Sequence, residues 1–258
     1  MRSIKSKLFV IFIFALALGA DVNLYGDTAD ELFKSGNVHY GNGEYELAIE
    51  DYRTVIDNGY ESFELFYNLG NAYFRINQIG KSILYYEKAK KLEPDDEDVI
   101  QNLNIAKLRT IDKIEEIDSF FVYEILSGIS NSLGLGIWTF LSLLFVWLSL
   151  VIGVLFVMTK SASGKKSLFL VTLIGVIITV FSYYFASVSY GEKTDDSGAI
   201  LMQASVYVKS SPDNSGTDLF ILHEGAKLRI SDLKNGWANI KLSNGKTGWV
   251  PLGSIERI

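Results

Sequence analysis

The sequence predicts a multidomain chain that combines an all-α helical repeat, a two-helix transmembrane hairpin and a small all-β barrel. Three observations predict this fold class. A helical pattern recurs at a fixed offset, two charge-free apolar runs follow it, and short alternating strands with Asn-Gly turns come last. We place the boundaries at residues 1–20 for a signal peptide, 27–114 for the repeat, 115–136 for an interfacial linker, 137–190 for the hairpin and 199–258 for the barrel.

The chain begins with a secretory signal pattern. Arg2, Lys5 and Lys7 precede an apolar run at residues 8–18, which has the length of a signal-peptide core. The small pair Gly19-Ala20 follows, so we expect cleavage close to it. An uncleaved anchor is the alternative, and it would leave the topology unchanged because the basic end stays inside in both cases.

Residues 27–114 carry an internal repeat. Gly36-Asn37 aligns with Gly70-Asn71 at an offset of 34 residues, and Tyr52 aligns with Tyr86 at the same offset. This period is the tetratricopeptide signature, and the stretch LGNAYF…SILYYEKAKKLEP resembles that repeat closely. We therefore expect pairs of antiparallel helices in which each of the two glycines lets the second helix approach.

The resemblance also implies a concave protein-binding groove lined by the first helix of each pair. Asn37 and Asn71 hold a position that often faces this groove, where a carboxamide can donate to and accept from a bound backbone. The alternative is that both only support packing. The candidate groove residues are Phe33, Asn37, Tyr40, Tyr67, Asn71 and Phe74. Because Phe33 and Tyr67 stand where a basic clamp residue would be expected, a peptide terminal carboxylate is disfavoured as the ligand.

A third helical pattern follows the two repeats. The acidic run Asp95–Asp98 is expected to cap it, since a calcium loop would need alternating ligands and a glycine. We expect Val99, Leu103, Ala106 and Ile114 to form one buried stripe. Two repeats are few for a solenoid, so this third helix, the membrane or a partner protein must cover the open end.

Two predicted membrane spans form the next segment. No charged residue lies in the range 125–159, and the expected spans are 137–158 and 168–190. Because neither span contains an ionisable group, we expect no proton or ion path. We expect the two helices to pack through Gly153 and Gly175.

The connection between the spans predicts their orientation. The loop at residues 159–167 carries Lys160, Lys165 and Lys166, and basic loops stay in the cytoplasm. The repeat and the barrel would then both face the periplasm, on the outer side of a bacterial inner membrane.

The segment from Ala199 to the end predicts a barrel of about five strands. Its turns include Asn235-Gly236 and Asn244-Gly245. The pattern VYVKSSPDNSG…LHEGAKLRI…NGWANIKLSNGKTGWV resembles the bacterial Src-homology-3-like (SH3-like) domain, which binds peptides, proteins or cell wall in some relatives and only packs in others. The candidate peptide-binding residues are Tyr207, Trp237 and Trp249, although the two tryptophans are alternatively barrel core and rim.

Composition argues against several classes of function. The chain has no cysteine, a net charge of -6, and two histidines, His39 and His223, in different segments. We therefore expect no catalytic residues, no metal site, no cofactor and no nucleic-acid partner. A cell-wall hydrolase would need a nucleophile with a base or a metal set, and neither pattern is visible.

The order of segments resembles the E-type protein of the Bacteroides aerotolerance (Bat) group, mainly in NLNIAKLRTIDKIE and LFILHEGAKLRISDLKNGWANIKLSNGKTGWVPLGSIERI. The resemblance implies an inner-membrane complex with von Willebrand A-type proteins and a MoxR-type ATPase, linked to aerotolerance or envelope stress. The expected function is a non-enzymatic scaffold that presents two protein- or peptide-binding modules in the periplasm. The alternative is a peptidoglycan-binding or cell-wall-sensing membrane protein.

Overall fold

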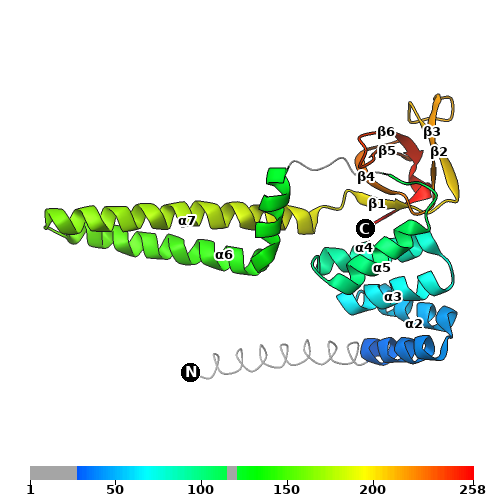
Figure 1. The fold of residues 1–258 in the computed structure, drawn as a ribbon, viewed down its shortest axis with the longest axis horizontal. Coiled ribbons are helices and arrows are strands. Elements are labelled where there is room, and N and C mark those ends of the chain that lie inside the picture. The colour runs from blue at the N-terminus through cyan, green and yellow to red at the C-terminus, as the bar shows by residue number, and fades with distance from the viewer. Residues whose placement is uncertain (1–27, 115–120) are drawn as a thin grey trace, which may run out of the picture. The chain divides into compact units, whose positions relative to one another are not determined.

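The computed structural model describes residues 28–114 and 121–258. The predicted signal peptide lies outside the described residues, as does the start of the predicted linker. The described chain forms two compact units. One unit combines the helical repeat with the β-domain, and the other contains the helical hairpin (Figure 1).

The repeat consists of antiparallel helices, as predicted. A first helix at residues 28–42 is followed by α2 (Tyr45–Asp57), α3 (Phe63–Arg75), α4 (Ile79–Leu92) and α5 (Glu97–Leu108). A Cβ atom at Gly36 would lie 2.6 Å from Cε1 of Tyr52, and one at Gly70 would lie 2.7 Å from Cδ1 of Tyr86. The two glycines are therefore required by the close approach of the second helix in each pair.

Helix α5 begins with the predicted cap. Asp96 accepts a hydrogen bond of 2.8 Å from the backbone N–H of Val99. Val99, Leu103 and Ala106 are buried against the repeat, as expected. The prediction was wrong for Ile114, which lies beyond the end of α5 and packs against the core of the β-domain instead.

The second unit is an antiparallel pair of helices, α6 (Phe121–Met158) and α7 (Ala162–Thr194) (Figure 1). Both are long and apolar enough to cross a membrane, over Ser132–Met158 and Ala162–Gly191. Helix α6 takes in described residues of the predicted linker and bends at Gly134, whose φ of 69° and ψ of 163° are not helical.

The tip of the hairpin is shorter than the predicted loop. Helix α7 already begins at Ala162, capped by Ser161, whose hydroxyl accepts from the N–H of Gly164. Lys165 and Lys166 therefore lie near the start of α7, while Lys160 lies in the connection itself.

The two hairpin helices contact through aromatic and small residues. The hydroxyl of Ser130 on α6 donates to the carbonyl of Phe185 on α7 at 3.1 Å, and the ring of Trp138 lies 4.9 Å from that of Phe185. A Cβ at Gly175 would lie 2.5 Å from Oγ of Ser149, so the predicted packing role is confirmed there. It was wrong for Gly153, where a Cβ would meet no atom within 4 Å.

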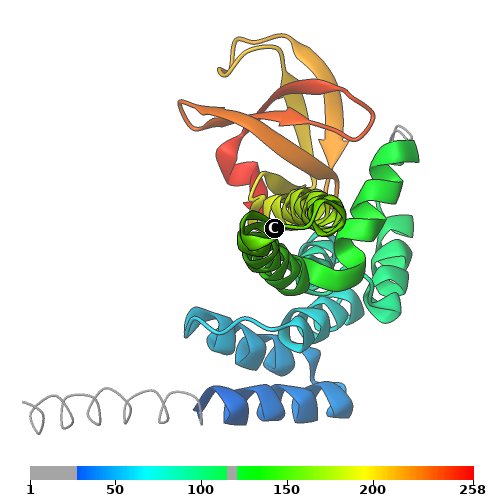
Figure 2. The same cartoon turned by 90° about the vertical axis from the view of Figure 1, so that its left-hand side faces the viewer.

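The β-domain is one antiparallel sheet in the order β3-β2-β6-β5-β4-β1-β7. Its strands are β1 (Gly198–Leu201), β2 (Ser205–Lys209), β3 (Asp218–His223), β4 (Lys227–Lys234), β5 (Trp237–Lys241), β6 (Thr247–Pro251) and β7 (Ile255–Arg257). The sheet curls around its apolar core (Figure 2), and it has seven strands where the sequence predicted about five. Asn235 and Gly236 have φ values of 52° and 79°, which a tight two-residue hairpin requires.

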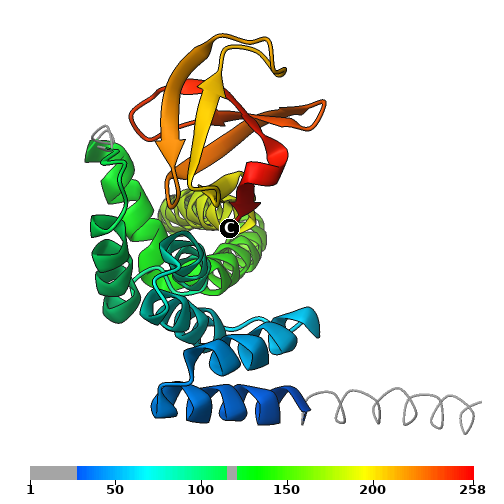
Figure 3. The same ribbon diagram turned by 90° about the vertical axis from the view of Figure 1, so that its right-hand side faces the viewer.

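The β-domain and the repeat, whose ribbons are drawn in Figure 3, share apolar contacts. Ile200 of β1 is fully buried within the apolar core of the repeat, and Met202 and Ile258 pack against the same core. These residues lie against α4 and its neighbours, which a further repeat would otherwise cover. The β-domain thus covers part of the surface that the sequence analysis left to the third helix, the membrane or a partner.

Candidate functional site

Asn37 of the first helix is held by two hydrogen bonds inside the repeat. Its side-chain oxygen accepts from the hydroxyl of Tyr52 at 2.7 Å and from the amide of Asn68 at 2.9 Å. A carboxamide oxygen has two lone pairs, so both are engaged within the protein. Tyr52 is fully buried, and this burial raises the pKa of its hydroxyl to about 12.

The same arrangement recurs one repeat later at Asn71. Its side-chain oxygen accepts from the hydroxyl of Tyr86 at 2.6 Å and from the amide of Asn102 at 3.1 Å. Asn102 lies on α5 and also donates to the hydroxyl of Tyr67 at 2.9 Å. Helix α5 therefore takes the place that the first helix of a third repeat would occupy.

All six predicted groove residues come from the first helix and α3. Phe33, Tyr40, Tyr67 and Phe74 are half-buried and pack against the repeat core. Asn37 and Asn71 lie among them, but their side-chain oxygens accept the hydrogen bonds from Tyr52 and Tyr86 described above. The amide nitrogens of Asn37 and Asn71 take no part in these hydrogen bonds, and the groove prediction itself stays a prediction.

Two arginines that the sequence analysis did not single out lie beside these residues. The guanidinium of Arg75 lies 4.9 Å from the ring centroid of Tyr45, and that of Arg109 lies 4.3 Å from the centroid of Phe74. The signal for this pair was present in the sequence, because the two arginines are 34 residues apart.

The three predicted peptide-binding residues of the β-domain lie on one face of its sheet. In β2, Val206 and Val208 point into the core while Tyr207 points outward and is 55% exposed. In β6 and β5, Trp249 and Trp237 occupy the corresponding outward positions and are half-buried.

Strand register fixes the order of residues across this outer face. Trp249 of β6 pairs with Lys209 of β2 on one side and with Asn239 of β5 on the other. Trp237 pairs with Pro251. Trp237 is the first residue of β5, and Trp249 is the central residue of β6. We call Tyr207, Lys209, Trp249, Asn239 and Trp237 the outer aromatic face.

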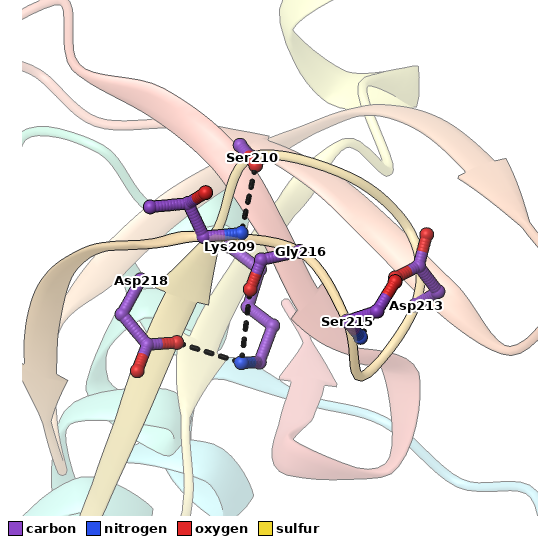
Figure 4. A network of polar contacts seen from close by, with 7 residues as sticks. Lys209, Ser210, Asp213, Ser215, Gly216 and Asp218 are labelled. Carbon is purple, nitrogen blue, oxygen red and sulfur yellow. Dashed lines mark hydrogen bonds and ion pairs between the residues drawn. The ribbon is translucent and has the colours of Figure 1, made fainter.

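A folded loop between β2 and β3 borders the outer aromatic face (Figure 4). The ammonium group of Lys209 contacts Oδ1 of Asp218 at 2.6 Å and the carbonyl of Gly216 at 3.3 Å. Asp213 accepts from the backbone N–H of Ser215 at 2.8 Å and from its hydroxyl, and this hydroxyl holds the pKa of Asp213 below its usual range. These contacts fix the loop at the edge of the face.

A buried carboxylate joins the repeat to the β-domain. Glu87 of α4 is 5% exposed and pairs with Lys227 of β4 at 2.7 Å and with Lys107 of α5 at 3.2 Å. Burial raises the pKa of Glu87, but the two positive charges outweigh it and hold that pKa below its usual range.

The turn between β3 and β4 supplies two further polar contacts with the repeat. Glu224 accepts from the N–H of Gly80 at 3.0 Å and so caps α4, whose own N-cap residue makes no side-chain bond. Asp112 accepts from the backbone N–H of His223 at 2.6 Å and contacts its Nδ1 at 2.9 Å. Within residues 28–114 and 121–258, no group of three acidic or histidine side chains gathers as metal ligands.

Comparisons with known proteins match both the helical repeat and the β-domain. Residues 63–96 match the tetratricopeptide repeat model, residues 36–77 match the TPR repeat model and residues 204–256 match the bacterial SH3 domain model. Tetratricopeptide repeat protein 6 of Homo sapiens is 32% identical over 79 residues, which are 31% of this chain and 15% of that protein.

These matches confirm the predicted repeat and the predicted SH3-like domain. Domains of both types are typically non-catalytic interaction modules. The resemblance to the Bat group stays a hypothesis.

Proposed function

We propose that the protein is a non-enzymatic inner-membrane scaffold that binds other envelope proteins in the periplasm. Matches to two kinds of interaction module and the presence of two membrane-length apolar helices support this proposal. The observation that carries it is the outer aromatic face, where Tyr207, Trp249 and Trp237 lie outside the barrel core. Half-exposed aromatic side chains offer apolar area together with a polar group, a combination that suits peptide recognition.

The proposed partners are von Willebrand A-type proteins and a MoxR-type ATPase of an aerotolerance or envelope-stress complex. This part of the proposal rests on the order of segments, which resembles the Bat group. The proposed orientation rests on Lys160, Lys165 and Lys166 at the tip of the hairpin, which favour a cytoplasmic tip.

Capture of partners by the native chain tests the proposal. The full-length tagged protein is crosslinked in its membrane, solubilised and purified, and the copurifying proteins are identified by mass spectrometry. We expect von Willebrand A-type proteins with the unchanged chain and about tenfold lower recovery with Trp249→Ala, the loss typical of a central tryptophan. If the unchanged chain recovers none of these proteins, the proposed complex is refuted.

A matched control comes from the other side of the sheet. Leu233 of β4 is 45% exposed and pairs with Ala238, whose side chain points into the core. Leu233→Ala therefore removes exposed apolar area without touching the outer aromatic face, and we expect it to leave partner recovery unchanged. Equal losses from both substitutions would mean that the face is not the binding surface.

Peptidoglycan is the second candidate ligand, and the bacterial SH3 domain match favours it. Sedimentation of the solubilised chain with purified peptidoglycan separates the two functions. Sedimentation that depends on Trp249, without copurifying proteins, would replace the scaffold by a cell-wall-binding function.

A further inference from the structure

We propose that Arg75 and Arg109 form a paired carboxylate-binding site on the repeat, which takes an acidic peptide segment of a partner protein. This inference rests on the proposed scaffold function and names a ligand class for its repeat. We call Arg75, Arg109 and the rings of Tyr45 and Phe74 the guanidinium row.

The two arginines occupy equivalent places on neighbouring helices. Arg75 is the last residue of α3, and Arg109 is the C-cap residue of α5. The hydrogen bonds from Asn68 to Asn37 and from Asn102 to Asn71 repeat at the same offset, so α5 follows α3 as α3 follows the first helix. Helices α3 and α5 thus both take the place of the first helix of a repeat, and the two guanidinium groups lie at the same end of these two helices.

An aromatic ring lies beside each of the two guanidinium groups. The guanidinium carbon of Arg109 lies over the ring of Phe74 and that of Arg75 lies over the ring of Tyr45, each within cation–π distance. Arg109 also reaches the side-chain oxygen of Asn77 at 3.4 Å. A stacked guanidinium keeps a planar fork of N–H donors that matches a carboxylate, and the ring reduces the rotamer freedom lost on binding.

Neither fork is used by a carboxylate of the protein. Both arginines are exposed, and over the described ranges no Asp or Glu lies within ion-pair distance of Arg75 or Arg109. By contrast, Lys34, Lys107, Lys209 and Lys227 each pair with an acidic side chain. The guanidinium row thus carries two uncompensated positive charges in a chain whose net charge is -6.

Charge complementarity and apolar surroundings define the occupant. Neighbouring packed helices lie roughly 8–10 Å apart, which is about three residues of a polyproline II segment, in which every third side chain faces the same way. Leu108 and Ile105 of α5 are 75% and 41% exposed near Arg109. The matching ligand is therefore a segment whose carboxylates lie about three residues apart with apolar side chains between them.

Fluorescence anisotropy with a synthetic peptide tests the site on the full chain in detergent. The probe is a labelled peptide with glutamates at every third position and leucines between them, and the reference peptide carries glutamine in place of glutamate. We expect the glutamate peptide to bind at least about tenfold more tightly than the reference peptide, with an affinity that falls as salt is raised. Equal binding of the two peptides would overturn the proposal.

Two double variants assign the binding to the guanidinium row. Arg75→Gln with Arg109→Gln should weaken the glutamate peptide by about tenfold or more. The matched control, Lys234→Gln with Lys241→Gln, removes the same charge from exposed positions of the β-domain and should leave binding within about twofold. Equal weakening by both double variants would show a nonspecific charge effect and overturn the site.

If the double glutamine variant unfolds at a lower temperature than the unchanged protein, the double variant Arg75→Lys with Arg109→Lys tests the site instead. It keeps both charges but removes the planar forks, so at least threefold weaker binding supports the site and unchanged binding overturns it.

The proposed scaffold function is tested independently, by comparing partner recovery between the unchanged chain and Trp249→Ala. Arginine-dependent peptide binding without any copurifying protein would refute the complex while leaving the site intact.

Discussion

At the residue scale, the repeat depends on Asn71 because its oxygen satisfies a buried tyrosine. Tyr86 is 2% exposed, and its hydroxyl donates to Asn71 at 2.6 Å. A buried hydroxyl without a partner costs more than the net value of the bond itself, because its hydration is lost without replacement. The contacts of Asn71 therefore favour the packing role, one of the two roles that the sequence left open.

We expect Asn71→Ala to destabilise the protein by about 1–3 kcal/mol, the cost of a buried polar group left unpaired. Thermal unfolding of the full chain, followed by circular dichroism, measures the loss. Asn104→Ala is the control, because Asn104 is exposed on α5 and should cost under about 0.5 kcal/mol. Unchanged stability of Asn71→Ala together with lost partner recovery would restore the ligand-binding role.

At the element scale, three lysines of the hairpin lie where α6 joins α7. The start of α6 and the end of α7 lie at the opposite end of the hairpin. Lys160 lies in the connection, and Lys165 and Lys166 lie near the start of α7. Because basic residues near the ends of spans stay in the cytoplasm, the chain segments on both sides of the hairpin should emerge in the periplasm.

A topology reporter fused after Ile258 tests this orientation. We expect a reporter that is active only in the periplasm to be active there, and a cytoplasmic reporter at the same place to be silent. Replacing all three lysines by glutamine should reduce the bias, since it depends on their charge. A cytoplasmic readout from the unchanged chain would refute the orientation and with it the proposed periplasmic partners.

At the scale of the whole first unit, the repeat and the β-domain form one compact unit with a charged contact between them. Glu87 joins α4 to Lys107 of α5 and to Lys227 of β4. Glu224 caps α4 from the β-domain, and Ile200 completes the apolar core of the repeat. The outer aromatic face and the guanidinium row therefore belong to the same compact unit.

Glu87→Gln should destabilise the unit by about 2 kcal/mol. Breaking a fully buried ion pair costs roughly 3–5 kcal/mol, and we expect less here because both lysines reach solvent. Chemical denaturation of the full chain measures the loss, with the exposed Glu50→Gln as the control.

The contribution of Glu87 should also depend on pH. Its pKa is lower in the folded protein than in the unfolded chain, so the stabilisation is present above the unfolded pKa. It is lost as the pH falls through the lowered pKa, and Glu87→Gln should remove this acid dependence. An acid dependence that is the same in both proteins would mean that another carboxylate is responsible.

The sequence by itself determined the features that depend on local pattern. The offset between Gly36 and Gly70 predicted the helix pairs, the charge-free runs predicted the hairpin, and Asn235-Gly236 predicted a β-turn, because each pattern reports the geometry of its own segment. Candidate residues were found in the same way, through fixed offsets and alternation along strands.

Only the tertiary structure decided how the repeat and the β-domain combine. The contacts of Glu224 with Gly80 and of Lys227 with Glu87 join residues more than a hundred positions apart. Such contacts leave no periodic pattern in a single sequence, since Glu87, Glu224 and Lys227 each look like an ordinary surface charge. The sequence likewise identifies Ile200 only as a strand residue, whereas the structure shows it buried in the core of the repeat. The division into elements is therefore a local property of the chain, whereas their union into one unit depends on long-range burial and charge pairing.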